Sequence, residues 1–234
     1  MEYTMYNTLL QLPLFQGMSK DDLSDIIEKA KFHFQKFESG AHLFHAGAPC
    51  FQLTFLIHGE LRAEIHAPCS DFSFIEIFTE PMLIEPHSLF GASPIYKATY
   101  TAQTSCSILS IDKQYIHSVL NAYEIFRINF FNHLCHKTEQ LHEKLWSINE
   151  QALEGRIIHF VKGLCSTYQG TKILKIKMEH LARLLDDTRL NVSYVLNKWE
   201  KGGIIEMHRK EFIFKDIGRL LPTLQSKITS VPFG

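Results

Sequence analysis

One stretch of the sequence constrains the fold more than any other: residues 112–150 contain neither glycine nor proline, and they follow a region of short apolar runs. Apolar or small side chains recur in this stretch at alternating spacings of three and four, which predicts a long helix with a heptad seam. The seam residues are Phe131, Leu134, Thr138, Leu141, Leu145 and Ile148. One seam on a single helix favours a second copy of the chain as its partner, so we expect a homodimer. The alternative is that the stripe packs on the chain's own N-terminal domain.

The region before this helix predicts an antiparallel β-barrel or sandwich. Several short strand-like runs are separated there by Gly, Pro and Ser, and such regular spacing is typical of antiparallel architectures. The runs are HFQKF, HLFHAG, LTFLIHG, LRAEIHA, FSFIEIFT, SLFGAS and SCSILSI. Ahead of them, Ser19 followed by Asp21 and Asp22 predicts the start of a short amphipathic helix. We therefore expect an N-terminal β domain with its short helix over 1–111, a dimerisation helix over 112–150 and a third region over 151–234.

The last region predicts a helix-turn-helix. Leu181, Ala182, Leu184 and Leu185 form the apolar side of a short helix, which a polar turn at Asp186 and Asp187 ends. Thr188 can cap a second helix, whose core face carries Val192, Val195, Leu196 and Trp199 at helical spacing. Two alternating strands around residues 208–210 follow a Gly-Gly pair and fit a wing.

This element predicts binding to duplex DNA. A recognition helix presents its N-terminal half to base edges, while the capping turn and the wing place donors on phosphates. The predicted contact residues are Thr188, Arg189, Leu190, Asn191, Ser193, Tyr194, Asn197, Lys198, His208, Arg209 and Lys210. Arg189 is the predicted base reader because a guanidinium can bind guanine O6 and N7 together. Its alternative role is a salt bridge to Asp186 or Asp187.

The charge distribution agrees with a nucleic-acid partner. From Glu150 onward the chain carries 14 Lys and Arg against 9 Asp and Glu, whereas residues 1–149 carry 10 against 16. A basic C-terminal region on an acidic body is what a polyanion-binding module attached to a sensor would show.

Other functional classes find little support. The five cysteines (Cys50, Cys69, Cys106, Cys135 and Cys165) stand singly, which predicts reduced thiols rather than disulfides or a zinc ribbon. No activated nucleophile, phosphate-binding glycine loop or metal triad marks an enzyme. The first residues lack the features of a signal peptide, and no run reaches the roughly 18 apolar residues of a membrane span. We expect a cytoplasmic protein without membrane contact.

A metal or haem site is an open alternative on the long helix. His136, Glu139 and Glu143 share a face there, near His133 and His142, and such side chains can ligate a divalent metal. Histidines at this spacing also occur on ordinary polar helix faces, so we expect no bound metal and no cofactor.

Taken in order, these segments resemble the CRP/FNR family of bacterial transcription regulators over nearly the whole chain. The resemblance is carried by LPLFQGMSKDDLSDI, by GAHLFHAGAPCFQLTFLIHGELRAEI, by the long helix and by MEHLARLLDDTRLNVSYVLNKWEKGGII. It implies an α+β chain with a cyclic-nucleotide-binding-like β-barrel (jelly roll), a dimerisation helix and a C-terminal winged helix-turn-helix. It also implies binding to duplex DNA as a homodimer, action on RNA polymerase and control by a small effector. The alternative is an effector-binding module that acts on a protein partner.

The recognition helix departs from the family pattern. Family helices often run Ser-Arg-Glu-Thr-Val-x-Arg, and the matching residues here are Thr188-Arg189-Leu190-Asn191-Val192-Ser193-Tyr194. Arg189 is kept, but Leu190 and Tyr194 replace the glutamate and the second arginine. We expect a different operator, with Leu190 touching a thymine methyl.

The ligand-binding stretch departs as well. In members that bind cyclic nucleotides, a Gly-Glu pair meets the ribose and an Arg-Ala or Arg-Ser pair meets the phosphate. The candidate ligand residues here are Leu89, Phe90, Gly91, Ala92, Ser93, Tyr96, Lys97, Ala98 and Thr99. Ala92 stands for the glutamate, and Lys97, a point charge without the guanidinium fork, is alone placed to meet an anion. We therefore expect an effector other than cAMP, or constitutive activity with a cavity closed by Phe90, Tyr96 and Phe126.

Overall fold

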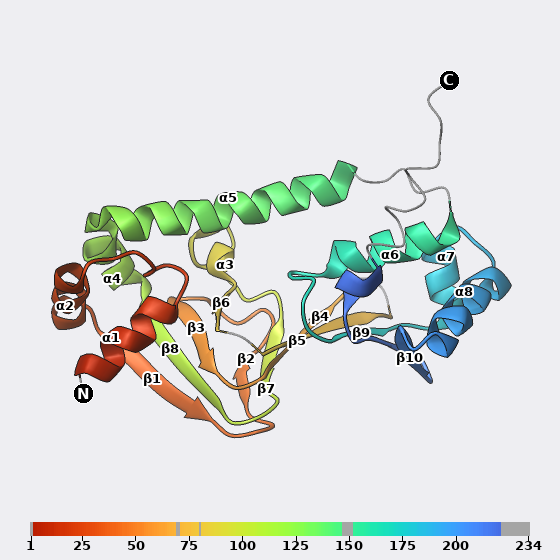
Figure 1. The fold of residues 1–234 in the computed structure, drawn as a ribbon, viewed down its shortest axis with the longest axis horizontal. Helices are drawn as coiled ribbons and strands as arrows, with labels where there is room; N and C mark the ends of the chain where they lie inside the picture. Colours follow the sequence, from red (N-terminus) through yellow and green to blue (C-terminus); the bar gives the residue numbers. More distant parts are fainter. Residues whose placement is uncertain (1, 69–70, 80, 147–151, 221–234) are drawn as a thin grey trace. The chain divides into compact units, whose positions relative to one another are not determined.

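The computed structural model describes residues 2–68, 71–79, 81–146 and 152–220 (Figure 1). The helices are α1 (Glu2–Gln11), α2 (Lys20–Lys29), α3 (Pro86–Phe90), α4 (Lys113–Ser118), η1 (Leu120–Ala122), α5 (Glu124–Trp146), α6 (Leu153–Leu164), α7 (Met178–Leu184), α8 (Arg189–Lys201) and η2 (Ile217–Leu220). The strands are β1 (Phe32–Phe37), β2 (His42–Phe44), β3 (Gln52–His58), β4 (Leu61–His66), β5 (Ser73–Phe78), β6 (Met82–Ile84), β7 (Thr99–Ala102), β8 (Cys106–Asp112), β9 (Lys172–Lys175), β10 (Ile205–His208) and β11 (Glu211–Phe214). The chain divides into two compact units, Met1–Ala63 with Phe78–Glu139 and Glu64–Ile77 with Gln140–Gly234.

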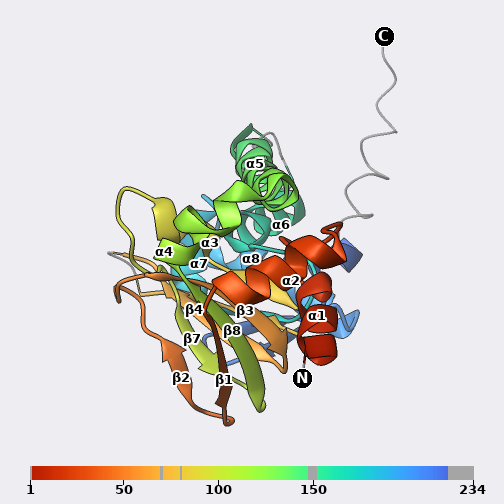
Figure 2. The ribbon, with the colours of Figure 1, turned by 90° about the vertical axis from the view of Figure 1, so that its left-hand side faces the viewer.

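The first unit is built on an antiparallel sheet of order β1-β8-β3-β6. β8 lies at its centre and pairs with β1 from Phe32↔Ile111 to Phe37↔Cys106, while β2 pairs separately with β7. Strands of both groups bury apolar side chains in one core, which α1 and α2 complete at one edge (Figure 2). The predicted antiparallel β domain is confirmed.

The start of α2 follows the sequence prediction. The Ser19 hydroxyl oxygen accepts a hydrogen bond from the backbone N–H of Asp22 at 3.1 Å, and the hydroxyl donates to the Asp22 carboxylate at 2.7 Å. Leu23 and Ile26, on the inner face of the helix, are fully buried. The helix start that the capping signal predicted is therefore confirmed.

Two local predictions in this unit differ from the structure. The helix expected from residue 112 is divided into α4, η1 and α5, because Leu120 is buried and the Tyr123 hydroxyl donates to the Asp25 carboxylate of α2. These tertiary contacts outweigh the helix propensity of the connecting residues. The run SLFGAS, expected as a strand, begins inside α3 because Pro86 sets the first helical turn.

The second unit contains a hairpin that the sequence assigned to the N-terminal domain. β5 pairs antiparallel with β9, from Ser73↔Lys175 to Glu76↔Lys172, and the strand order is β10-β11-β9-β5, with β4, whose second half Glu64–His66 belongs to this unit, next to β5. Phe74 is 3% exposed and belongs to the core that also holds Trp199 and Phe214. β5 thus covers the edge of β9, which would otherwise present unpaired backbone groups.

A buried ion pair joins these two strands. Lys172 has no exposed surface, and its ammonium lies 3.2 Å from a carboxylate oxygen of Glu76. The same carboxylate accepts hydrogen bonds from the backbone N–H of Ser166 at 3.0 Å, and the ammonium donates to the carbonyl of Gln169 at 2.6 Å. Such satisfaction by neighbouring polar groups is what allows two charges to be buried together.

Candidate nucleic-acid interface

The turn between α7 and α8 is fixed by its own polar side chains. Asp186 adopts the left-handed conformation, with φ of 50°, and Thr188 caps α8 by accepting a hydrogen bond from the backbone N–H of Asn191 at 3.2 Å. One oxygen of Asp187 accepts from the backbone N–H of Thr188 at 2.7 Å and from the side chain of Asn191 at 2.9 Å. The predicted Thr188 cap is confirmed.

Asp187 also ties the turn to α6. Its second carboxylate oxygen pairs with the guanidinium of Arg156. The hydrogen bonds from Asn191 and Thr188, together with Arg156, hold the pKa of the Asp187 carboxyl below its usual range. These contacts hold the first turn of α8 in one conformation without any ligand.

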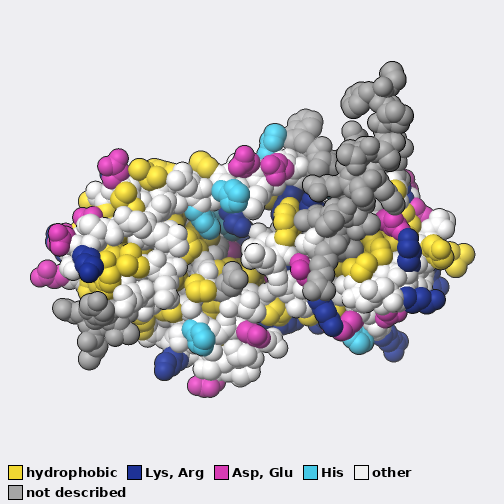
Figure 3. All heavy atoms as spheres, viewed as in Figure 1, with side chains coloured by type: hydrophobic (Ala, Val, Ile, Leu, Met, Phe, Trp, Pro, Cys, Tyr) yellow, Lys and Arg dark blue, Asp and Glu magenta, His cyan; other side chains and the backbone are white. Residues whose placement is uncertain are grey.

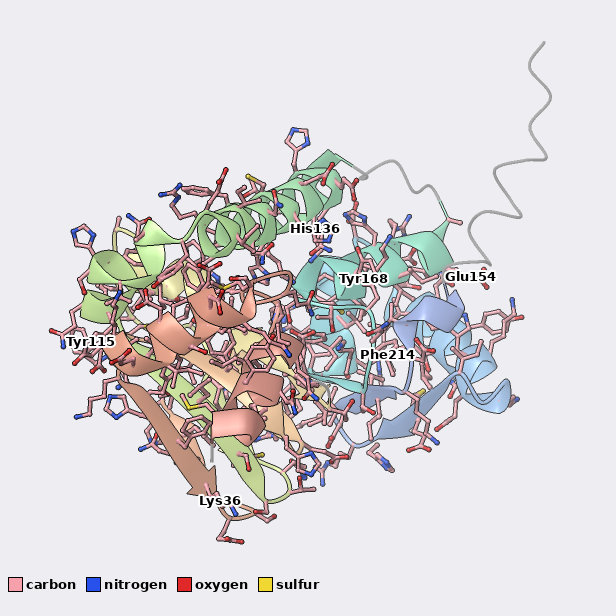
Figure 4. The ribbon with its side chains drawn as sticks, turned by 60° about the vertical axis from the view of Figure 1, so that its left-hand side comes forward. Lys36, Tyr115, His136, Glu154, Tyr168 and Phe214 are labelled. Atoms are coloured by element: carbon pink, nitrogen blue, oxygen red, sulfur yellow. The ribbon has the colours of Figure 1, made fainter. Side chains whose placement is uncertain are left out.

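One face of α8 forms the core of the unit. Val192 and Leu196 are fully buried, and Val195 and Trp199 are 7% and 6% exposed, as the spacing predicted. Figure 4 shows Phe214 of the same core, together with Glu154 on α6. Leu184, expected on the apolar side of α7, is instead 44% exposed, because Leu181 and Leu185 fill that side.

The opposite face of α8 is open. Leu190 and Tyr194 are 81% and 72% exposed, which is high for two large apolar side chains on an ordered helix. Beside them the Nε of Arg189 lies 3.3 Å from Glu179 of α7, not from Asp186 or Asp187 as the alternative role required. This ion pair is exposed on both sides, so it holds the arginine only weakly.

The remaining predicted contact residues of the helix border this open face. Asn197 donates to the Ser193 hydroxyl at 3.2 Å, and the ammonium of Lys198 lies 2.9 Å from Glu154. Thr188, Asn191 and Asn197 are exposed. All the predicted helix residues therefore lie at or beside one surface of the second unit.

A short wing follows α8. β10 and β11 form a hairpin that closes with the pair His208↔Glu211, leaving Arg209 and Lys210 in the turn. Lys210 has φ of 65°, and its carbonyl accepts a hydrogen bond from the backbone N–H of Ile176 at 2.9 Å. His208, Arg209 and Lys210 are exposed. The space-filling view shows dark blue basic side chains beside yellow hydrophobic ones at the end that carries α8 (Figure 3).

The candidate ligand residues of the first unit do not share one environment. Leu89, Tyr96 and Ala98 are buried, Thr99 is half-buried, and the rest are exposed: Phe90, Gly91, Ala92, Ser93 and Lys97. Of the three aromatic side chains expected to close the cavity, Tyr96 and Phe126 are buried, but Phe90 is 48% exposed. Tyr96 stacks on Phe44 with ring centroids 4.2 Å apart.

The sequence prediction missed the polar centre of this region, Glu85. Its carboxylate is buried and accepts four hydrogen bonds: from Ser88 Oγ at 2.8 Å, from the backbone N–H groups of Lys97 and Ala98 at 2.8 and 2.9 Å, and from the Tyr100 hydroxyl at 3.1 Å. The signal that could have revealed it is an acidic residue standing directly between the apolar MLI and a proline. Buried acidic residues are rare enough to require partners.

The seam expected on the long helix lies on α5, and most of its described side chains are exposed. Phe131 and Leu141 are 60% and 58% exposed, Leu134 is half-buried and Thr138 is exposed. The side chain of Leu145 and the whole of Ile148 lie outside the described residues.

The histidine-rich face of α5 shows a weak contact. His136 Nδ1 lies 3.8 Å from Glu139, with both side chains mostly exposed. Among the described residues there is no group of three or more His, Cys, Asp or Glu side chains arranged to hold a metal ion.

Comparison with known proteins matches both units to families. Residues 34–123 match the model of the cyclic nucleotide-binding domain, and residues 155–222 match the Crp-like helix-turn-helix domain. The two matches follow one another in the order seen here and together cover more than half of the chain. The chain belongs to the CRP/FNR family. This family consists of DNA-binding transcription regulators and not of enzymes.

Solved structures of this family share the fold. The chain is similar to the catabolite activator protein of Thermus thermophilus, at 15% identity, 92% coverage of this chain, 99% of that one and a TM-score of 0.52. It is also similar to the sensor domain of the regulator DNR from Pseudomonas aeruginosa, at 19% identity, 65% coverage of this chain, 99% of that one and a TM-score of 0.51. None of the curated proteins matches it. At these identities the likeness concerns the fold alone.

The described helices were compared with the length and apolarity that a membrane span needs. Across the described ranges, each helix is too short or too polar to cross a membrane.

Proposed function

We propose that this CRP/FNR regulator is a cytoplasmic homodimer that binds a two-fold symmetric operator through α8 and regulates transcription with RNA polymerase. In this proposal the first unit takes an effector other than cAMP, or the protein acts without one. Neither a metal nor haem is part of the proposal, because the described donors on α5 lie on an open helix face.

The open face of α8 is the observation that carries the DNA-binding proposal. The turn residues fix the start of the helix, and the buried Val192 and Leu196 fix its rotation, so the exposed side chains point consistently outward. Leu190 can contact a thymine methyl and Arg189 can read a guanine, while Arg209 and Lys210 of the wing can contact phosphates. Releasing Arg189 from its exposed pair with Glu179 costs little.

The dimer proposal rests on α5. Phe131 and Leu141 are large, apolar and exposed on one side of a helix, and a second copy of the same helix would cover them. A dimer would place two recognition helices on two half-sites, one or more helical turns apart.

The test is a genomic operator selection with the purified full-length chain, comparing wild type, Arg189→Ala and Lys36→Ala. Lys36 is an exposed residue of β1, and Lys36→Ala removes one positive charge from the first unit, as Arg189→Ala does from the second. It therefore serves as the matched control. We expect wild type and Lys36→Ala to select the same palindromic site, and Arg189→Ala to lose the preference for that site.

Failure to enrich any sequence, at low salt as well as at physiological salt, would contradict the proposal. In that case the exposed Leu190 and Tyr194 would favour the alternative, in which the second unit meets a protein partner.

A further inference from the structure

Glu85 places a carboxylate inside the first unit, where four donors converge on it. Each of its oxygens accepts one backbone N–H and one hydroxyl: Lys97 N–H and Ser88 Oγ on one, Ala98 N–H and Tyr100 Oη on the other. We call these four donors the Glu85 seat. Among the described residues, no lysine, arginine or histidine lies within ion-pair distance of this carboxylate, so the seat holds its anion with neutral dipoles.

This donor set has the chemistry of a phosphate site. Consecutive backbone N–H groups and hydroxyls converging on one point form a nest for an oxyanion, and such bonds to charged acceptors are strong. The seat lies within residues 34–123, which match a domain named for cyclic nucleotides, ligands that carry an anionic phosphate. In this chain the nest already contains an anion.

The backbone of Glu85 indicates that its side chain is needed there. Its φ is 38°, a left-handed conformation that glycine adopts freely and that a longer residue adopts under strain. Such strain persists where surrounding contacts determine it. The four hydrogen bonds of the carboxylate supply those contacts.

We propose that Glu85 is a built-in ligand: its carboxylate occupies the oxyanion seat from within the chain and excludes phosphate-bearing effectors. The sensor unit is then held in one state without a nucleotide, and emptying the seat creates a site for small oxyanions.

The seat is connected to the dimerisation helix. α3 begins directly after Glu85, and its Phe90 contacts Phe130 of α5 with ring centroids 6.1 Å apart. Lys113 secures the other end of α3 by donating to the Leu89 carbonyl at 2.9 Å. A filled seat therefore holds α3 against the helix that carries the proposed seam, and this consequence rests on the proposed function.

The experiment empties the seat with Glu85→Gly, a change that suits the positive φ and leaves the four donors in place. Thermal unfolding of the full-length chain is followed in formate, inorganic phosphate or chloride at equal ionic strength. We expect the variant to unfold about 10 °C below wild type in chloride and to recover at least half of that difference, saturably, in formate and phosphate. Wild type should show no such recovery, because its seat is full.

The matched control is Glu85→Gln, which fills the seat with a neutral amide of the same shape. Its NH₂ group meets a backbone N–H instead of accepting from it, so we expect a loss of stability that neither anion restores. If Glu85→Gly does not fold in chloride, refolding from urea into each anion makes the same comparison. Folding in formate or phosphate alone supports the proposal, and folding in none of the three overturns it.

Equal responses of Glu85→Gly and wild type to the anions would also overturn the proposal and reduce Glu85 to a structural brace. Operator binding provides a separate reading. If Glu85→Gly responds to formate but wild type binds no operator, the seat proposal holds and the proposed function fails. If wild type binds an operator but Glu85→Gly shows no response to the anions, the proposed function holds and the seat proposal fails.

Discussion

The Glu85 seat and the open face of α8 differ in whether their side chains are bonded within the chain or exposed to a partner. In the first unit a buried carboxylate and its four donors satisfy one another completely, so that nothing is left for a partner. In the second unit Leu190 and Tyr194 are exposed on α8, a helix that is capped at its start and buried along its opposite face. The difference is that the polar groups of the Glu85 seat bind one another inside the first unit, whereas the exposed side chains of α8 are left for a partner.

The largest expected effect tests whether the second unit, like the first, depends on a buried carboxylate that is held by partners within the chain. Lys172→Met should destabilise the second unit by about 3 kcal/mol, because it leaves the Glu76 carboxylate buried without its ion-pair partner. Urea unfolding measures the loss. Lys175→Met, on the same strand but partly exposed, is the control and should cost less than about 1 kcal/mol. Equal losses for the two variants would show that the buried pair contributes no more than an ordinary surface lysine.

The next prediction concerns the other open surface, the seam on α5. Phe131→Glu should weaken self-association at least 100-fold, which corresponds to about 2.7 kcal/mol, because a charge replaces an apolar side chain in the seam. Analytical ultracentrifugation measures the dimer, and the exposed neighbour Asn132→Glu, off the seam, is the control. A Phe131→Glu variant that associates like wild type would mean that α5 is not the dimer interface.

A smaller effect is expected inside the seat. Tyr100→Phe removes one hydroxyl donor to a buried carboxylate and should cost about 2 kcal/mol in urea unfolding. Tyr115→Phe on α4 removes a hydroxyl from a partly exposed tyrosine and should change stability by less than about 0.5 kcal/mol. A negligible loss for Tyr100→Phe would indicate that the Glu85 network is weaker than its geometry implies.

The smallest effect on stability is expected on the open face. The double variant Leu190→Ala and Tyr194→Ala should unfold within about 0.5 kcal/mol of wild type, since both side chains are exposed, yet bind the operator at least ten-fold less tightly. Val192→Ala, buried on the other face of α8, should show the converse, a stability loss of about 1–2 kcal/mol. A large stability loss in the double variant would remove the contrast between the two faces.

The helix caps and the buried stripe of α8 were predicted correctly from the sequence, whereas the pairings between distant residues were not. The caps at Ser19 and Thr188 and the buried stripe of α8 depend on residues within one or two turns, and the structure confirms them. The pairing of β5 with β9 joins residues about 100 positions apart, so no periodicity could reveal it. The role of Glu85 likewise depends on backbone groups 12 and 13 residues away.

The same distinction explains the error on the long helix. The absence of glycine and proline predicted one helix from residue 112, but the hydrogen bond from Tyr123 to Asp25 joins residues 98 positions apart, which a local pattern cannot show. The exposure of Leu184 is a separate, local error: the apolar side of α7 is filled by Leu181, Ala182 and Leu185.

The central claim, that α8 reads duplex DNA, is tested most directly by equilibrium affinity for the selected operator and for a scrambled duplex across a salt series. For wild type we expect the operator to be bound at least 1,000-fold more tightly, with both affinities falling steeply as salt rises, and Arg189→Ala should lose most of that ratio while keeping the salt dependence. A ratio near one at every salt concentration, or an unchanged ratio in Arg189→Ala, would contradict the claim.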